Sequence, residues 1–204
     1  EIDREKRLHY LATHDSLTGL PNRLALLDRL ENAIQRHHRN GTRFALIFVD
    51  LDNFKPINDR FGHDIGDKIL CICAERLKAG SRESDTVARL GGDEFVVLID
   101  ELPELSELNT VCERLINSLT EQPVRIGPDE IHLQASLGTS IFPSDGETPD
   151  KLLHCADDAM YSQKRSHQHH RHSLSSIPNL ELVRNMSPTL SAEVEQKDSA
   201  ILAH

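Results

Sequence analysis

The sequence predicts an α+β domain in which helices cover a mostly antiparallel central sheet. Along the chain, apolar patterns follow the order helix, strand, helix, hairpin, helix, strand, helix, which is typical of that class. The 204 residues suit one medium domain with appendages. A composition of 38% hydrophobic and 27% charged residues indicates a soluble globular protein.

The N-terminal elements are identified by their apolar spacing. Residues 3–13 carry a few apolar side chains amid charge, as in a helix end or the exit of a short coiled coil. Residues 15–23 are rich in turn formers, and leucines then recur at helical spacing until Asn40-Gly41. The apolar run 44–49 predicts a central strand buried on both faces.

The middle and C-terminal elements follow the same logic. A polar stretch precedes a helix that has Ile69 and Leu77 on one face. Residues 86–90 and 93–99 predict two strands joined by a tight glycine turn. Three further elements are expected, namely a helix over 105–116, a strand over 131–142 and a helix over 152–160.

Charge and composition exclude several classes of protein. With 33 acidic and 23 basic residues the net charge is −10, which argues against a nucleic-acid binder. No apolar run is long enough to span a bilayer, and the N-terminus lacks a signal peptide's apolar core, so no membrane contact is expected from this segment. The four cysteines form no CxxC pair, which favours a reducing cytosol. The absence of GxxxxGK[ST] disfavours a P-loop NTPase.

The C-terminal tail differs from the rest of the chain. Four basic and four acidic residues balance over 165–204, so the first 164 residues carry the whole net charge. The tail is rich in Ser, His and Pro without an apolar period, and we expect it to be mostly disordered. Its His-rich stretch 167–172 could bind a metal ion, although a solvated polar tail is the favoured interpretation.

Acidic side chains stand where two predicted strands would meet. Asp50 and Asp52 end the buried strand, and Asp93-Glu94 follow the glycine turn. Converging carboxylates beside a core are costly unless a cation or a raised pKa relieves them, which indicates Mg²⁺ or Mn²⁺. Polymerases use such a pair to activate a 3′-hydroxyl against an α-phosphate. Spacing alone favours a simpler role in capping the strand and forming the turn.

Six motifs occur together across about residues 14–165. They are Gly91-Gly92-Asp93-Glu94-Phe95, Asp15 to Arg23, Asp50 to Asp67, Arg89-Leu90, Ser136-Leu137-Gly138 and Ala156 to Lys164. In their order and spacing these motifs resemble the GGDEF family, the diguanylate cyclases. The resemblance implies a ferredoxin-like, polymerase-palm-like nucleotide cyclase fold over residues 15–166. It also implies a helical linker from an upstream domain over 1–14 and a polar tail over 167–204.

The resemblance implies condensation of two GTP into cyclic di-GMP with release of two pyrophosphates, at a site formed between two domains of a homodimer. Mg²⁺ or Mn²⁺ would be the cofactor, held by Asp50, the backbone carbonyl of Leu51 and Asp93. Asp93, with Glu94 beside it, would help to deprotonate the attacking 3′-hydroxyl. Which of the two is the general base stays open.

Substrate recognition follows from the same resemblance. Asn58 and Asp67 match the guanine readers, and a carboxylate that accepts from N1–H and the N2 amino group fits guanine rather than adenine. His63 would support this pocket or merely pack the loop. The signature glycines Gly91 and Gly92 count among the substrate-binding positions. Lys55 and Lys164 resemble phosphate contacts that offset charge in the transition state.

An RxxD motif lies five residues before the signature glycines. By resemblance, Arg82 and Asp85 would bind cyclic di-GMP as an inhibitory product, with Arg114 in support. Arginine suits this role because its planar fork meets phosphate in a bidentate manner and stacks on purines. The alternative is an exposed ion pair within a turn.

One departure from the family pattern separates the candidate functions. After Lys164 the family usually continues Gly-Arg-Asn, whereas this chain reads Arg165-Ser166-His167. An active cyclase is favoured, and a catalytically silent module that binds GTP or cyclic di-GMP and signals to a partner is the alternative. A cyclase that uses ATP is disfavoured by Asp67. No EAL-type phosphodiesterase sequence follows residue 165, and the expected location is the cytoplasm or the cytoplasmic face of a membrane.

Overall fold

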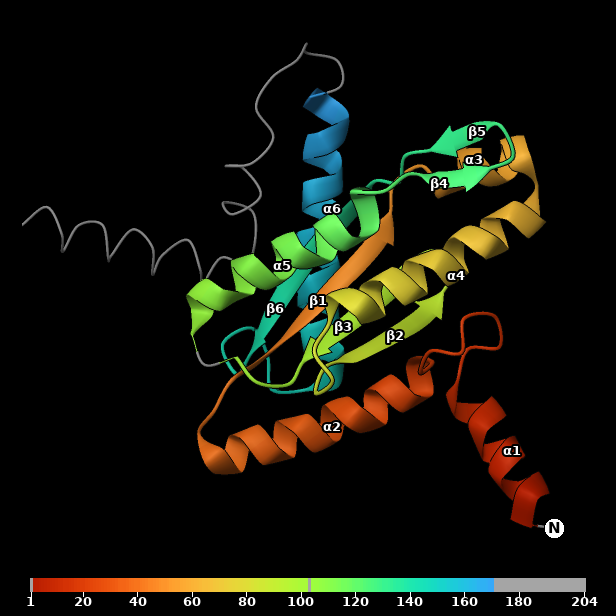
Figure 1. The fold of residues 1–204 in the computed structure, drawn as a ribbon. Helices are drawn as coiled ribbons and strands as arrows, with labels where there is room; N and C mark the ends of the chain where they lie inside the picture. The colour runs from red at the N-terminus through yellow and green to blue at the C-terminus, as the bar shows by residue number, and fades with distance from the viewer. Residues whose placement is uncertain (1, 103, 171–204) are drawn as a thin grey trace, which may run out of the picture.

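The computed structural model describes residues 2–102 and 104–170. A four-stranded sheet in the order β2-β3-β1-β6 forms the centre, and each neighbouring pair of strands is antiparallel (Figure 1). The α+β class with a mostly antiparallel sheet is therefore confirmed. The elements are α1 (Ile2–Thr13), α2 (Arg23–Asn40), β1 (Phe44–Leu51), α3 (Phe54–Phe61), α4 (His63–Gly80), β2 (Thr86–Gly91), β3 (Glu94–Ile99), α5 (Leu105–Thr120), β4 (Val124–Ile126), β5 (Asp129–Ile131), β6 (Ala135–Phe142) and α6 (Pro149–His170).

Strand β1 is the centre of the core, and all eight of its residues are buried, as predicted for its apolar run. Successive side chains point to opposite faces of a strand. Ile47 and Val49 accordingly pack with α4 and α5, whereas Leu46 and Phe48 pack with α2 and α6. Figure 1 shows one layer of helices on each face of the sheet. This alternation decides which helices face each polar residue at the end of β1.

Two local elements differ from what the sequence predicted. The stretch after β1, for which only a polar composition was predicted, contains the short helix α3 and the start of α4. Only Phe54 of α3 is buried, so that helix leaves almost no apolar period in the sequence. The strand predicted over 131–142 is two strands, because β5 ends at Ile131 in a small hairpin with β4 and β6 begins at Ala135.

Glycine at position 138 sets how closely α6 approaches the sheet. A Cβ there would overlap the backbone of Ala156 and would lie 2.7 Å from the Cα of Met160. Helix α6 therefore lies directly against β6 on the α2 side of the sheet. This close contact fixes the height at which Lys164, one turn further along α6, stands over the end of β1.

The chain ends were only partly predicted. Helix α6 continues to His170, so residues 167–170 are helical and not part of a disordered tail. The rest of the predicted tail, 171–204, which includes the last two residues of the His-rich stretch 167–172, lies outside the described residues. Within the described part of the chain, no helix is both long enough and apolar enough to cross a membrane. Helix α1 projects from the domain (Figure 1), and its Leu8 and Leu11 are exposed.

Candidate functional site

The predicted meeting of carboxylates at one sheet edge is found in the structure. Asp50 on β1 is the register partner of Glu94 on β3. Both side chains lie on the face of the sheet that α2 and α6 cover. Phe48, two residues before Asp50, and Val96, two residues after Glu94, pack on that face, and side chains two residues apart share a face of a strand. Asp93 lies in the turn directly before Glu94. Asp50, Asp93 and Glu94 are thus brought to one end of the two central strands.

Lys164 supplies a counter-charge that sequence reasoning did not place here. Its Nζ donates a hydrogen bond to Asp50 Oδ1, and the two residues are 114 positions apart in the sequence. Burial raises the pKa of the Asp50 carboxyl, and Asp93 and Asp52 add to that rise, although the Lys164 ammonium opposes it. Burial lowers the pKa of Lys164, but hydrogen bonding to Asp50 and attraction to Asp52 and Asp93 outweigh this and leave it raised.

The Glu94 carboxyl also has a raised pKa. Its burial is the main cause, and the negative charges of Asp50, Asp157 and Asp93 act in the same direction, while Arg23 at the start of α2 opposes them. Such repulsion indicates an acidic cluster that would be stabilised by binding a cation or by accepting a proton.

Two further polar residues make hydrogen bonds near this cluster, and the sequence did not assign a role to either of them. Ser136 on β6 donates to Asp52 Oδ1 at 2.9 Å. Gln163 on α6 is buried, and its Oε1 accepts from the backbone N–H of Leu137 at 2.7 Å. Both lie in segments that resemble family motifs, but only the packing of α6 on β6 shows what they contact.

The turn that carries Asp93 requires glycine. Residues 91–94 are here called the signature turn, and within it Gly91 has φ 151° and Gly92 has φ 51°. Side chains are disfavoured in these conformations, and nothing lies within 4 Å of a Cβ placed on either residue. The glycines therefore serve the backbone path and leave open space beside it. The β2–β3 register also shifts between Arg89 and Gly91, as at a β-bulge.

The predicted guanine readers lie on α3 and α4. Asn58 is half-buried on α3, and its Oδ1 is buried without a hydrogen-bond partner. This oxygen lies against Gly66 of α4, where any Cβ would overlap it. His63, Asp67 and the predicted phosphate contact Lys55 are exposed. An unsatisfied buried acceptor is uncommon and marks a place where a donor from a ligand would be stabilised.

The predicted inhibitory residues lie away from the carboxylates. Arg82 and Asp85 share the turn between α4 and β2, where Asp85 Oδ2 accepts from the Arg82 backbone N–H at 2.8 Å. The Arg82 guanidinium, half-exposed, lies 3.7 Å from Glu107 of α5. Arg114, also on α5, donates from Nε to the Gly80 carbonyl at 2.6 Å. The turn and α5 therefore bring the three predicted residues to one side of the domain.

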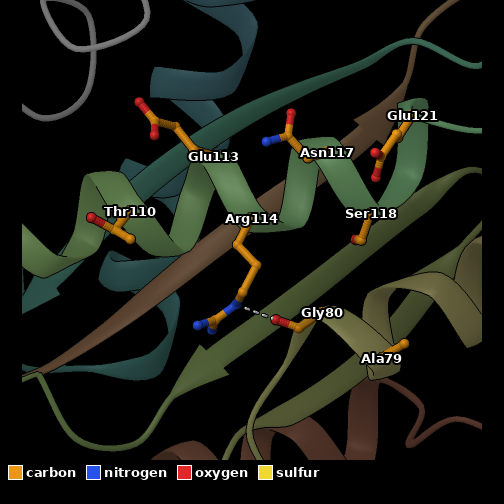
Figure 2. Close-up of a pocket in the computed structure, with 8 residues that line it drawn as sticks. All are labelled: Ala79, Gly80, Thr110, Glu113, Arg114, Asn117, Ser118 and Glu121. Carbon is orange, nitrogen blue, oxygen red and sulfur yellow. Dashed lines mark hydrogen bonds between the residues drawn. The ribbon is translucent and has the colours of Figure 1, made fainter.

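Arg114 lines an open pocket of about 480 Å³ between α4 and α5. Figure 2 shows its side chain reaching across the gap to Gly80, and its Nη2 is buried without a hydrogen-bond partner. This pocket is separate from the carboxylate cluster, which lies at the far end of β1 and β3. Its lining residues are Ala79, Gly80, Thr110, Glu113, Arg114, Asn117, Ser118 and Glu121.

The carboxylate cluster fits a hard divalent cation by its donor chemistry. Asp50 and Asp93 offer carboxylate oxygens and Leu51 a backbone carbonyl, which suits an ion that is usually held by one or two carboxylates plus substrate phosphates. Over the described part of the chain, no group of three or more His, Cys, Asp or Glu side chains is arranged to hold a metal ion by itself. The missing ligands would therefore have to come from substrate or water.

Comparison with known proteins identifies the family. The family model for the GGDEF domain, described as diguanylate cyclase, matches residues 12–170. The bifunctional diguanylate cyclase/cyclic di-GMP phosphodiesterase MucR of Pseudomonas aeruginosa is 48% identical over 159 residues, which are 78% of this chain and 23% of MucR. Diguanylate cyclase TpbB of the same organism is 40% identical over 164 residues, 80% of this chain and 38% of TpbB.

Solved structures give the same answer. The GGDEF domain of TpbB aligns with a TM-score of 0.72 and 41% identity over 75% of this chain and 89% of that one. The GGDEF domain of DgcB from Caulobacter crescentus, solved in complex with c-di-GMP, aligns with a TM-score of 0.67 and 26% identity over 76% and 89% of the two chains. This chain thus spans well under half the length of MucR and TpbB, and it belongs to the GGDEF domain family.

Proposed function

We propose that this domain is a diguanylate cyclase, which condenses two GTP into cyclic di-GMP and releases two pyrophosphates. The observation that carries the proposal is the direct pairing of Asp50 with Glu94 across β1 and β3, with Asp93 in the adjoining turn. Carboxylates whose pKa values are raised by burial and mutual repulsion are typical of functional sites. The condensation forms a bond from each 3′-oxygen to the α-phosphorus of the other GTP, and each 3′-hydroxyl loses its proton as a pyrophosphate leaves.

The acidic cluster supplies both metal ligands and a proton acceptor in this proposal. Asp50, Asp93 and the Leu51 carbonyl would hold Mg²⁺ or Mn²⁺, which would neutralise phosphate charge and increase the acidity of the 3′-hydroxyl. Asp93 or Glu94 would accept the proton, since both lie at the same strand end. Lys164, which already faces Asp50, stands close enough to this cluster to exchange its carboxylate partner for a triphosphate oxygen.

Base recognition would depend on α3 and α4. Asn58 and Asp67 would bind guanine, supported by His63, with Gly91 and Gly92 leaving room for the nucleotide beside the signature turn. The unsatisfied Asn58 Oδ1 supports this assignment, because a buried acceptor without a donor is destabilising until a ligand provides one. Lys55 is exposed on α3 and would contact phosphate.

Catalysis would require a homodimer, since each domain would present one GTP to the other. The exposed apolar side chains of α1 support this arrangement, with Leu8 59%, Tyr10 50% and Leu11 56% exposed. Apolar residues in such number on a projecting helix favour pairing with a second helix. The reaction would take place where GTP is available, in the cytoplasm or at the cytoplasmic face of a membrane.

Product inhibition would act at a separate site formed by Arg82, Asp85 and Arg114. The unpartnered Arg114 Nη2 beside an open pocket supports an anionic ligand there. The same observation favours the second candidate function, a silent module that binds cyclic di-GMP and signals to a partner. The sequence Arg165-Ser166-His167, which replaces the family's usual Gly-Arg-Asn after Lys164, also favours that candidate.

Incubation with GTP and Mg²⁺, scored for cyclic di-GMP, separates these functions. The cyclase proposal expects product from wild type and none from Asp93→Ala. If folded, dimeric wild type forms no product, the cyclase proposal fails. Binding of cyclic di-GMP that is lost in Arg82→Ala and retained in Arg125→Ala would then favour the signalling module. Arg125 is a suitable control because it is 79% exposed and pairs with Glu130 on a distant hairpin.

A further inference from the structure

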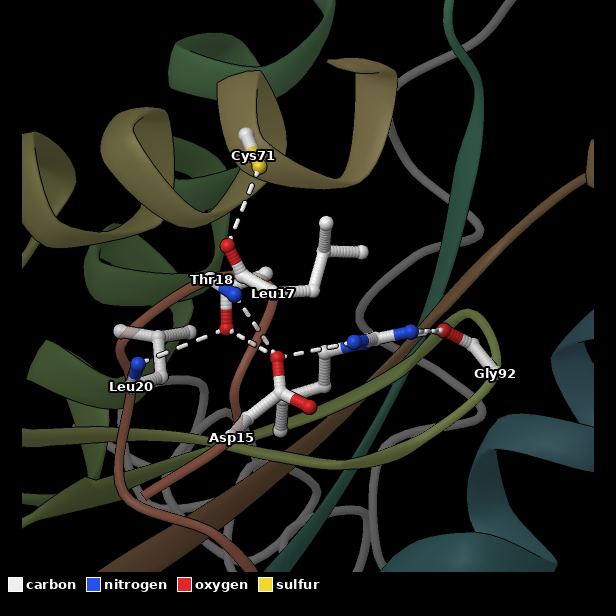
Figure 3. Close-up of polar contacts among 7 residues, drawn as sticks. Asp15, Leu17, Thr18, Leu20, Cys71 and Gly92 are labelled. Carbon is white, nitrogen blue, oxygen red and sulfur yellow. Dashed lines mark hydrogen bonds and ion pairs between the residues drawn. The ribbon is translucent and has the colours of Figure 1, made fainter. Parts of the chain in front are cut away.

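The signature turn is held by a side chain from the strand that leads into it. Arg89 on β2 donates from Nε and from Nη2 to the Gly92 carbonyl, at 3.1 and 2.7 Å. Its side chain is only 10% exposed. By its place on β2, Arg89 lies on the α4 side of the sheet, opposite the face that carries Asp50 and Glu94. In Figure 3 a dashed line ends on the carbonyl oxygen of Gly92.

Fixing the Gly92 carbonyl also fixes Asp93. The carbonyl of Gly92 and the amide of Asp93 belong to one planar peptide unit, so a restraint on the oxygen orients the whole plane. The two glycines of the turn give the backbone freedom and provide no side chain to limit it. The paired hydrogen bonds from Arg89 therefore restrain the peptide unit that leads into Asp93.

Arg89 is itself held by the loop that follows α1. Asp15 Oδ1 accepts from Arg89 Nη1 at 2.8 Å, although the two residues are 74 positions apart. The same oxygen accepts from the backbone N–H and the hydroxyl of Thr18, at 2.9 and 2.7 Å. Asp15 is 21% exposed, so the ion pair is partly shielded from water. The three donors converge on one oxygen in Figure 3.

The loop is also bound to its surroundings by backbone contacts. Its residue Pro21 accepts from the backbone N–H of Arg89 at 2.9 Å, and its residue Leu17 accepts from the thiol of Cys71 on α4 at 3.5 Å. Asn22 donates from its side chain to the carbonyl of Ala12 in the last turn of α1, at 2.8 Å. Two side-chain contacts, Asp15 to Arg89 and Arg89 to Gly92, thus connect the end of α1 to the signature turn.

We infer that Arg89, oriented by Asp15, is a positioning residue for Asp93 and makes the geometry of the active site depend on the loop after α1. The inference rests on the proposed cyclase function, because it concerns how the carboxylate that serves that reaction is aimed. Arg89 does not touch the reacting atoms in this account. Its contribution is the orientation of one peptide plane.

The test compares Arg89→Lys with Arg29→Lys. A lysine at 89 keeps the positive charge but cannot make two hydrogen bonds to Gly92 and a third to Asp15. Arg29 is a matched control, since it donates to the Thr86 hydroxyl at 2.9 Å and so joins α2 to the other end of the same strand. Steady-state kinetics with GTP and binding of 3′-deoxy-GTP, which cannot condense, separate positioning from recognition.

We expect Arg89→Lys to lower kcat by at least about tenfold while the affinity for 3′-deoxy-GTP changes by less than about twofold. Arg29→Lys keeps the wild-type kcat. Asp15→Asn retains an acceptor oxygen and falls between wild type and Arg89→Lys, whereas Asp15→Ala matches Arg89→Lys. An unchanged kcat in Arg89→Lys, or an equal fall in kcat in both lysine variants, overturns the inference.

Amide hydrogen exchange provides a readout that does not need activity. In Arg89→Lys the amides of Asp93 and Glu94 should exchange faster than in wild type and in Arg29→Lys, with the rest of β3 unchanged. If wild type makes no cyclic di-GMP, the proposed function fails, and exchange alone decides the inference. Equal protection of the turn in all three proteins overturns it, while a local loss in Arg89→Lys supports it.

Discussion

Replacing Gly66 by Ala should remove the Asn58 side chain from its place without unfolding the domain. A Cβ at position 66 would overlap Asn58 Oδ1 and would lie 2.9 Å from Asn58 Cγ and 3.3 Å from Phe54 Cζ. The obstructing group is the end of a flexible side chain, so Asn58 can rotate away. Ala is favoured over Gly in a helix by about 1 kcal/mol, which offsets much of the cost of that rotation.

The expected magnitude follows from the role of Asn58. If its amide binds guanine, its displacement removes one or two hydrogen bonds worth about 1–1.5 kcal/mol each, which is a loss of about tenfold in affinity per bond. The free energy of unfolding should change by less than about 1 kcal/mol. Gly66→Ala should therefore weaken nucleotide binding while its stability stays close to that of wild type.

Titration calorimetry with 3′-deoxy-GTP and urea unfolding measure both quantities. Asn58→Ala should weaken binding by the same factor, and the double variant should be no weaker than either single one, because both changes remove the same contact. Wild-type affinity in Gly66→Ala, alongside weakened binding in Asn58→Ala, would refute the steric reasoning. A loss of stability above about 3 kcal/mol would show that Asn58 cannot move.

Two further predictions concern stability. Gly138→Ala should lower the free energy of unfolding in urea by at least about 3 kcal/mol, because the added Cβ would overlap rigid backbone of α6 near Met160. An unchanged midpoint of urea unfolding would contradict the close approach of α6 to β6. Burial raises the pKa of Asp15, but hydrogen bonds from Thr18 and Arg89 outweigh burial and leave the pKa lowered. The ionised Asp15 carboxylate therefore stabilises the fold above its unfolded-state pKa, and this stabilisation is lost as pH falls through its folded-state pKa. Asp15→Asn should accordingly cost about 1–2 kcal/mol at pH 7, and this gap should shrink as pH falls below the ordinary range of an Asp carboxyl, whereas a gap that does not change with falling pH would contradict this.

The carboxylate cluster was largely predictable from the sequence, because it depends on local patterns. An apolar run that ends in Asp50, and a glycine turn followed by Asp93 and Glu94, fix the strand ends once the two strands are paired. The observed register of Asp50 with Glu94 confirms that expectation. The pairing needed no knowledge of distant contacts beyond the adjacency of two strands in an antiparallel sheet.

The partners of these groups could not be predicted, because they come from tertiary packing. The position of Lys164 over Asp50 depends on how closely α6 lies against Gly138, and the link from Asp15 to Arg89 depends on the loop that crosses β2. Helix α3 escaped detection because Phe54 is its one buried residue. Periodicity reveals a buried face only where several residues share it.

The most direct test of the central claim measures both products of GTP turnover in the presence of Mg²⁺. Wild type and Asp158→Asn, which changes an exposed carboxylate of α6, should yield cyclic di-GMP and about two pyrophosphates for each one, as two phosphoryl transfers require. Asp93→Asn should lower the rate by at least about a hundredfold while the protein stays folded and dimeric. Wild-type turnover by Asp93→Asn, or no cyclic di-GMP from folded, dimeric wild type, would contradict the assignment of the active site to the paired ends of β1 and β3.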